Sequence, residues 1–367
     1  MSVILLTLAV LAIAITVFIF SMDPNKLKPS IIAEVKKQTG YNMTIDGRLT
    51  WSLYPLLGIK IEHMTLTAPS ASSPFLDLRG VNIASEFKQI LRGTQKLKGD
   101  VRIDDMRLAK LHMQNAYIGI DWQNQMLTLM PVKASLYDGK LDGVVHGSHL
   151  FAVPRWDWNM HASSVQIKPL LADVSDGNTK LQIDGLGEIN MKAETQGKTK
   201  DSLLMNLNGN GNFALHNGSV LGTDINFLIE SADALMSRRL MPTQNMNQTQ
   251  FDNLSGSFML AHGSANISDL QLLSSAFTIK GDGNINLLTQ NLDLQLAVSS
   301  LKTTTLKGTI PLLVQGDLHS PSVRLDMNAV NAMITREQIN KAKAKIQEHV
   351  KGLSDKADKF LQKLIGQ

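Results

Sequence analysis

The sequence of 367 residues contains no cysteine, which excludes disulfide bonds, thiolate metal sites and cysteine nucleophiles. It also lacks the G-x-x-x-x-G-K-[ST] loop that binds nucleotide phosphates, the G-x-S-x-G turn of serine hydrolases and the H-E-x-x-H motif of zinc proteases. The sequence therefore does not predict an enzyme, and we expect no cofactor. Stability must come from apolar burial and strand pairing, for which an apolar content of 43% is sufficient.

Outside the C-terminal end, basic and acidic residues balance, so that part of the chain has no net charge. Residues 335–367 carry eight basic and four acidic residues, and this surplus equals the net charge of +4 for the whole chain. The neutral remainder predicts no nucleic-acid partner. The nine histidines are dispersed, and His146 and His149 form the nearest approach to a metal site. A spacing of three on a strand directs side chains to opposite faces, so we expect solvated histidines rather than metal ligands.

One long apolar run is present at the N-terminal end. Residues 2–20 contain no charged side chain, and a helix of about 19 residues at ~1.5 Å per residue crosses a bilayer core of ~30 Å. No small-x-small cleavage site follows, so we predict a single-pass transmembrane anchor over residues 1–21 rather than a removed signal peptide. The nearest basic residues, Lys26, Lys28, Lys36 and Lys37, all follow the run. The positive-inside rule taken alone would place the rest of the chain in the cytoplasm.

Residues 22–40 are predicted to form an amphipathic helix beside the membrane. Ile31, Ile32 and Val35 recur at helical spacing, Pro29 lies in the expected first turn, and Gly40 follows the last turn.

Beyond residue 40 the apolar period changes from helical to alternating, which indicates half-buried β-strands. Residues 291–299 are typical: leucine and valine alternate with Asp, Gln and Ala. Pairs such as Asp46-Gly47, Asp138-Gly139, Asp142-Gly143 and Asp282-Gly283 are predicted to form the hairpin turns between strands. The body is therefore predicted to be mainly β, a long antiparallel meander. Helices are expected to interrupt it at 86–91, 168–173 and 224–239.

The C-terminal segment, residues 329–367, is predicted to form a cationic amphipathic helix. Apolar residues recur at steps of three and four: Ile339, Ala342, Ile346, Val350, Leu353, Ala357, Phe360 and Leu364. Lysines occupy much of the other faces. Two interpretations remain open: the tail contacts an anionic bilayer or a partner helix, or it docks on its own sheet with solvated lysines.

Three stretches of the chain resemble the AsmA family of envelope proteins. The first is DPNKLKPSIIAEVKKQTGYNMTIDGRLTWSLYPLLGIKIEHMTLTAP at residues 23–69, and LYDGKLDG follows at 136–143. The third runs from FALHNGSVLGTDINFLIE at 213–230 to IPLLVQGDLHSPSVRLD at 310–326. The order of these stretches carries the resemblance, which divides the body into an N-terminal region, 41–200, and a C-terminal region, 201–328.

The resemblance implies a cell inner-membrane anchor with the bulk of the chain in the periplasm. It further implies a long curved antiparallel sheet that forms an apolar groove, and a role in outer-membrane biogenesis through glycerophospholipid transport. The implied partners are membrane lipids and, as a further expectation, envelope proteins.

Alternating apolar residues are the candidate lining of such a groove. An acyl tail of about fifteen carbons would lose on the order of 12 kcal/mol in water at ~0.8 kcal/mol per methylene, and an apolar trough replaces most of that contact. The candidates are Val101, Ile103, Leu181, Ile183, Leu292, Leu294, Leu296, Val298, Val323 and Leu325. The alternation by itself favours a closed sandwich of two sheets, whereas the resemblance favours an open groove. The alternative function is a closed β-scaffold that assists outer-membrane protein insertion without binding lipid.

Overall fold

The computed structural model describes residues 23–52, 58–69, 71–85, 96–123, 126–150, 152–175, 182–237, 239–243, 246–301 and 308–334, and a few residues between 336 and 347. The anchor predicted over 1–21, the helix expected at 86–91 and most of the predicted tail lie outside these ranges. Within the described ranges, no helix is both long enough and apolar enough to cross a membrane.

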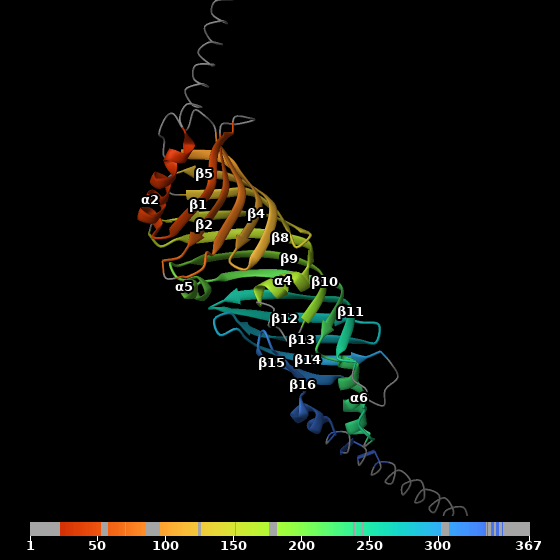
Figure 1. Ribbon diagram of the computed structural model, residues 1–367. Helices are drawn as coiled ribbons and strands as arrows, with labels where there is room; N and C mark the ends of the chain where they lie inside the picture. The colour runs from red at the N-terminus through yellow and green to blue at the C-terminus, as the bar shows by residue number, and fades with distance from the viewer. Residues whose placement is uncertain are drawn as a thin grey trace, which may run out of the picture.

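The described strands form one antiparallel sheet of sixteen strands, and their order across the sheet is their order along the chain. Figure 1 shows them succeeding one another along an elongated, curved body. The predicted long antiparallel meander is therefore confirmed. The closed sandwich favoured by alternation alone is wrong for the described strands, because they form a single sheet. A period of two only requires one buried face and does not specify what buries it.

The strands have the following bounds: β1 (Asn42–Ser52), β2 (Gly58–Thr67), β3 (Leu76–Ser85), β4 (Lys96–Leu108), β5 (Leu111–Gln123), β6 (Met126–Leu136), β7 (Gly139–Ser148), β8 (Arg155–Gln166), β9 (Gln182–Gln196), β10 (Asn208–Leu221), β11 (Gln248–Ala261), β12 (Ser264–Leu273), β13 (Phe277–Asn286), β14 (Asn291–Ser300), β15 (Ile310–Asp317) and β16 (Ser322–Leu325).

Short helices interrupt the sheet at three of the predicted places. A 3-10 turn, η1 (Pro24–Leu27), leads into α2 (Lys28–Thr39), which ends at Gly40 in the left-handed conformation. The other two are α4 (Ile167–Val174) and α6 (Ile225–Met236). A further helix, α5 (Lys200–Met205), was not predicted from the sequence, although the side chains of Thr199 and Ser202 form a capping box at its start. Residues 327–334 are also helical.

Most of the glycine pairs predicted to be turns lie inside strands, so that prediction was wrong. Asp138-Gly139 lies at a hairpin turn, whereas Asp142-Gly143 and Asp282-Gly283 lie within β7 and β13. A Cβ on Gly283 would lie 2.7 Å from Leu294 Cδ2, and a Cβ on Gly143 would lie 2.3 Å from Met160 Sδ. These glycines are therefore used for close contact with a neighbouring strand rather than for a turn. Asp46-Gly47 coincides instead with a shift of strand register between β1 and β2.

The strand register sorts the side chains onto two chemically different faces. Residues opposite one another on neighbouring strands share a face, and apolar residues face apolar residues from β1 to β16. One such row contains Ile45, Met64, Leu78, Met106, Met113 and Leu136 on β1 to β6. Another contains Leu296, Leu312 and Leu325 on β14 to β16. We call the surface made by these rows the apolar face.

The opposite surface, the polar face, carries hydrogen-bonded rows of polar side chains. On β8 to β10, His161 Nδ1 and Asn190 Oδ1 are 2.6 Å apart, and Asn190 donates to Asn212 across 3.1 Å. On β14 to β16, Gln315 donates to Asp293 and accepts from Arg324. This face is suited to water, so the sheet leaves its apolar side to be covered by something else.

Candidate functional site

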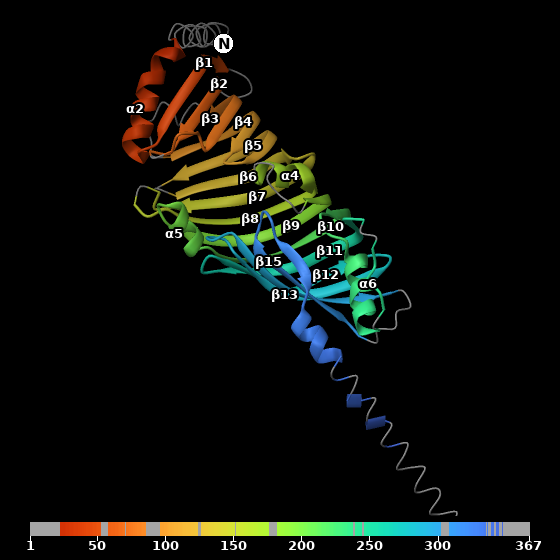
Figure 2. The same ribbon diagram turned by 60° about the horizontal axis from the view of Figure 1, so that its bottom comes forward.

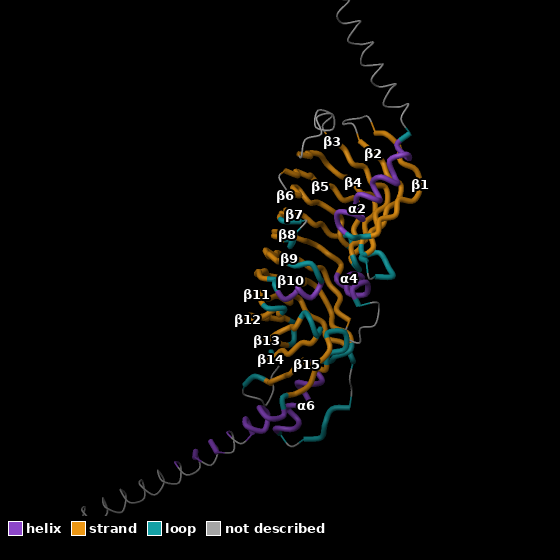
Figure 3. The backbone as a smooth tube through the Cα atoms, turned by 90° about the vertical axis from the view of Figure 1, so that its left-hand side faces the viewer, coloured by secondary structure: helices purple, strands orange, loops and turns teal. Residues whose placement is uncertain are grey.

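Helices cover the apolar face at its two ends. At the N-terminal end, Ile31 and Ile32 of α2 pack against buried Leu49 and Val81 of the sheet. At the C-terminal end, Ile225 and other residues of α6 pack against a cluster drawn from β10 to β15. Figure 3 shows α2 and α4 on the same side of the sheet. The ends of the apolar face are therefore built like ordinary protein cores.

Between these ends, six apolar residues lie at the borders of the buried clusters. Ile118 and Ile120 on β5, Leu129 and Val132 on β6, Val145 on β7 and Trp158 on β8 are all half-buried, and none is buried. We call these six residues the central patch. They are contiguous because Ile118 lies opposite Val132, Ile120 opposite Leu129, Leu129 opposite Val145, and Val145 opposite Trp158. The central patch is thus a continuous apolar surface across four strands that remains partly accessible.

Glycines beside the central patch let large side chains of the neighbouring strand lie close to the sheet. Gly143 lies opposite Met160, and Gly147 lies opposite Trp156. A Cβ on Gly147 would meet the Trp156 ring at 2.7 Å, so the indole lies over the glycine rather than beside it. Large side chains that lie flat on the backbone form a thin layer, and a thin layer leaves more room above the sheet.

The helix α4 is fixed to one rim of the sheet beside the central patch. The Tyr137 hydroxyl donates to Asp173 Oδ2 across 2.8 Å and accepts from the backbone N–H of His112. The Lys110 ammonium donates to the carbonyl of Val174 across 3.0 Å. Burial raises the pKa of Tyr137 to about 12, and the neighbouring Asp173 acts in the same direction. Tyr137 therefore stays neutral at physiological pH and links α4 to β5, which α4 contacts together with β9.

The polar face near the N-terminal end carries histidine–carboxylate pairs. His63 Nε2 lies 3.0 Å from Asp77 Oδ1, and His63 Nδ1 lies 3.4 Å from Asp46 Oδ2. His112 Nε2 lies 2.7 Å from Asp105 Oδ2, and this hydrogen bond lowers the pKa of Asp105. Within the described residues, no three His, Asp or Glu side chains are grouped so that they could hold a metal ion. These pairs join neighbouring strands.

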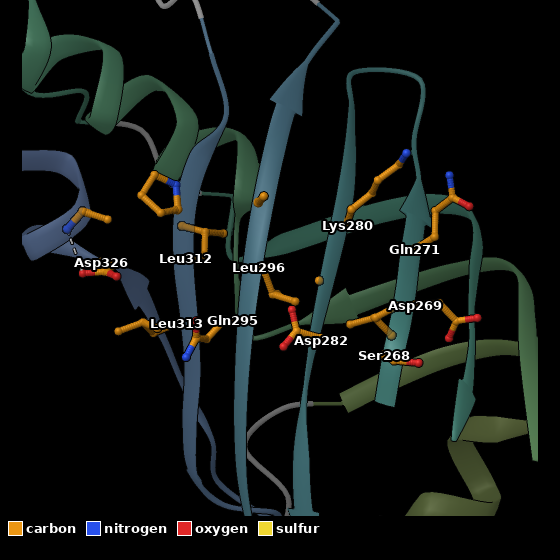
Figure 4. A pocket seen from close by; sticks show the side chains of 15 residues that line it. Ser268, Asp269, Gln271, Lys280, Asp282, Gln295, Leu296, Leu312, Leu313 and Asp326 are labelled. Carbon is orange, nitrogen blue, oxygen red and sulfur yellow. Dashed lines mark hydrogen bonds between the residues drawn. The ribbon is translucent and has the colours of Figure 1, made fainter. Parts of the chain in front are cut away.

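The polar face is also hollowed. A hollow of about 690 Å³ lies over β12 to β15, and Figure 4 shows Lys280, Asp282 and Gln295 among its lining. A second hollow of about 560 Å³ is lined by His146, Lys192 and other residues of β7 to β10. Charged and amide side chains line both hollows, together with apolar residues such as Pro311 and Leu313 in the first and Val144 in the second.

Comparison with known proteins places this arrangement in a family. The profile of the AsmA family matches residues 1–99 and 86–270, which is more than half of the chain. The chain belongs to the AsmA family. The resemblance drawn from the three sequence stretches is thereby confirmed.

A curated relative matches over a short stretch. Protein AsmA of Escherichia coli (strain K12) is 31% identical over 72 residues, which is 20% of this chain and 12% of that protein. The match thus spans only a small part of the relative's length. No solved structure gives a significant match.

In this AsmA-family chain, the candidate lining residues lie toward the two ends of the apolar face. Val101 and Ile103 belong to the N-terminal cluster. Ile183, Leu296, Val298, Val323 and Leu325 belong to or pack against the C-terminal cluster. Leu292 is buried and Leu294 half-buried on β14, and Leu181 lies outside the described residues. Their contact with lipid stays a prediction.

The central patch of this AsmA-family chain was not predicted from the sequence. The signal was available, because Ile118, Ile120 and Trp122 alternate with Gly119 and Asp121 in the same way as the strands that were chosen. Alternation identifies a strand face but does not rank faces by exposure. That ranking depends on where the helices lie.

Proposed function

We propose that this AsmA-family chain is a non-enzymatic envelope protein that carries the acyl chains of glycerophospholipids along its apolar face and so supports outer-membrane biogenesis. The observation that carries the proposal is the central patch, a contiguous apolar surface that stays half-buried in a single sheet. Leaving apolar surface of this kind in water costs free energy, and such a surface marks a binding site in many soluble proteins. The sheet supplies the site and no catalytic group is required.

The chemistry of the two faces suits a molecule with an apolar tail and a polar head. Each methylene transferred from water to the central patch contributes about 0.8 kcal/mol. An acyl chain that moves from one strand to the next replaces one apolar contact with a similar one, because Leu129, Val145 and Trp158 lie opposite one another on neighbouring strands. The headgroup stays at the rim in water. Net flow then depends on a lipid gradient or a partner protein, since the sequence has no phosphate-binding loop.

The proposed location is the inner membrane, with a single-pass anchor over residues 1–21 and the body in the periplasm. The uncharged run at residues 2–20 and membership of the AsmA family support it. The orientation is a proposal against the charge rule, because Lys26 and Lys28 follow the run. A reporter enzyme that is active only outside the cytoplasm, fused at the C-terminus, tests it. An inactive, stably expressed fusion would contradict the periplasmic location.

Two adjacent valines offer a matched test of lipid contact. Val145 lies on the apolar face opposite Trp158, whereas Val144 lies on the polar face opposite Asn159. Both are half-buried. A photoreactive residue at position 145 should crosslink to phospholipid in cell membranes, and the same residue at 144 should not. Equal or absent labelling at the two positions would contradict lipid carriage on the apolar face.

A further inference from the structure

The helix α6 crosses the apolar face at its C-terminal end. It leaves β10 and returns to β11, and it contacts both β11 and β16. Those two strands are separated by four others in the sheet, so α6 spans the strands between them. Figure 2 shows α6 in the C-terminal half of the body, close to β11 and β12.

The contact between α6 and the sheet is as tight as a protein core. Ile225, Ile229 and Ala232 of α6 are 6%, 5% and 1% exposed, and Phe277 and Val298 beneath them are completely buried. In the central patch, by contrast, no residue is buried. The side chains of α6 therefore occupy space on the apolar face that is still accessible four strands earlier.

A second cluster fills the other rim of the same region. Ala193, Leu260 and Ala265 are buried there, and Leu207 and Phe258 pack against them. From β10 onward the apolar face is thus filled along one rim by α6 and along the other by this cluster. Both rims therefore contain buried residues, whereas the central patch contains none.

The start of α6 is fixed by hydrogen bonds to the strand that follows it. Asp224 Oδ1 accepts from the N–H of Phe227 across 3.0 Å, and Asp224 Oδ2 accepts from the N–H of Met246 across 2.9 Å. Thr249 Oγ1 accepts from the N–H of Ile225 and donates to the carbonyl of Thr223. Because Asp224 and Thr249 are buried, these bonds hold the first turn of α6 at β11.

We propose that α6 is the terminus of the acyl-chain site, so that bound chains occupy the central patch and stop before β11. This inference rests on the proposed function. Ile225, Ile229 and Ala232 determine the boundary because they take the contacts that an acyl chain would otherwise make with Phe277 and Leu312. Lipid reaches β14 only in molecules whose α6 has left the sheet.

The test compares two photoreactive positions in the full chain, reconstituted into vesicles of phosphatidylethanolamine and phosphatidylglycerol. Position 145 reports the central patch, and position 296 reports the face under α6, since Leu296 is half-buried and packs against the α6 cluster. Each probe is placed in the unchanged chain, in Ile229→Asn and in Glu230→Asn. Glu230 is the matched control because it is the next residue of α6 and is exposed.

The unchanged chain should be labelled with phospholipid at 145 and not at 296. Ile229→Asn should raise labelling at 296 roughly tenfold, as a loosened contact shifts the equilibrium of α6. Glu230→Asn should leave it unchanged. Circular dichroism verifies folding, and Ile229→Ala replaces Ile229→Asn if the latter unfolds.

Three outcomes would overturn the terminus. The first is that position 296 of the unchanged chain is labelled as strongly as position 145. The second is that a folded Ile229 variant is labelled at 145 but not at 296. The third is that Glu230→Asn raises labelling at 296 as much as Ile229→Asn does. Absence of label at 145 in every background would instead overturn the proposed function itself, and the terminus with it.

Discussion

Val144 and Val145 are consecutive on β7 but belong to opposite faces of the sheet, since Val144 lies opposite Asn159 and Val145 opposite Trp158. Consecutive residues of the strand thus belong one to the apolar face and the other to the polar face. The whole body repeats this relationship, which gives it a polar surface on one side and, on the other, an apolar surface on which α2 and α6 pack.

Val145→Asp should abolish lipid association with the central patch while Val144→Asp leaves it intact. A carboxylate among Leu129 and Trp158 would have to be desolvated when an acyl chain is bound. Native mass spectrometry of gently extracted protein should show at least about a tenfold loss of bound phospholipid for Val145→Asp. Similar loss for Val144→Asp would show that the effect is not specific to the apolar face.

Gly283→Ala should destabilise the protein by about 1–3 kcal/mol through overpacking. The new Cβ would lie 2.3 Å from the carbonyl oxygen of Asp293 and 2.7 Å from Leu294 Cα, both on the next strand, β14. Lys280→Ala is the control on β13, because Lys280 is exposed on the polar face. Chemical denaturation measures both; equal midpoints for the two variants would show that the glycine has no packing role.

Phe277→Ala should cost about 3–5 kcal/mol of unfolding free energy, because it leaves a cavity in the cluster beneath α6. Phe277 is 0% exposed, whereas Leu301, the first residue after β14, is 61% exposed. Leu301→Ala should therefore change stability by no more than about 0.5 kcal/mol. Urea unfolding of the two variants, side by side, checks whether this end of the apolar face is packed as a core.

Tyr137→Phe should be destabilising near pH 8, by about 1 kcal/mol, through loss of the hydrogen bonds to Asp173 and from His112. The pKa of Tyr137 is raised from 10.0 to about 12 in the folded chain. A raised pKa favours the protonated fold, so this contribution is complete below pH 10 and is lost as the pH rises from about 10 to about 12.

The difference in melting temperature between the unchanged chain and Tyr137→Phe should therefore shrink when the pH is raised from about 8 to about 11.5. Phenylalanine does not titrate, so the pH dependence of Tyr137→Phe shows what the rest of the chain contributes. A difference that stays constant or widens with pH would contradict the assignment of a half-buried, neutral Tyr137.

Asn25→Ala should expose the N-terminal edge of the sheet and cost about 1 kcal/mol. Asn25 Oδ1 accepts from the N–H of Leu49 across 2.9 Å, and Asn25 Nδ2 donates to the carbonyl of Leu49 across 3.2 Å, as a neighbouring strand would. An edge without such a partner pairs with other chains. Light scattering at rising concentration should show more self-association for Asn25→Ala than for Asn42→Ala, an exposed position at the start of β1.

The glycine pairs show that a dipeptide typical of turns does not by itself specify a turn. Asp282-Gly283 satisfies the turn rule, yet Gly283 lies within β13 because Leu294 crosses above it. By contrast, the turn after β11 uses His262 in the left-handed conformation beside Gly263. A dipeptide specifies which backbone angles are permitted, and the neighbouring strand decides whether they are used.

The sequence by itself determined the alternating pattern, the helices α2, α4 and α6, the neutral body and the family, because each of these depends on neighbours along the chain or on residue order. Only the tertiary structure decided that the strands form one sheet, that Leu296 packs against the cluster to which α6 contributes and that Val145 remains half-buried. Exposure on the apolar face depends on helices that are distant in sequence from the strands they cover, and a period of two is the same whether a strand is covered or open.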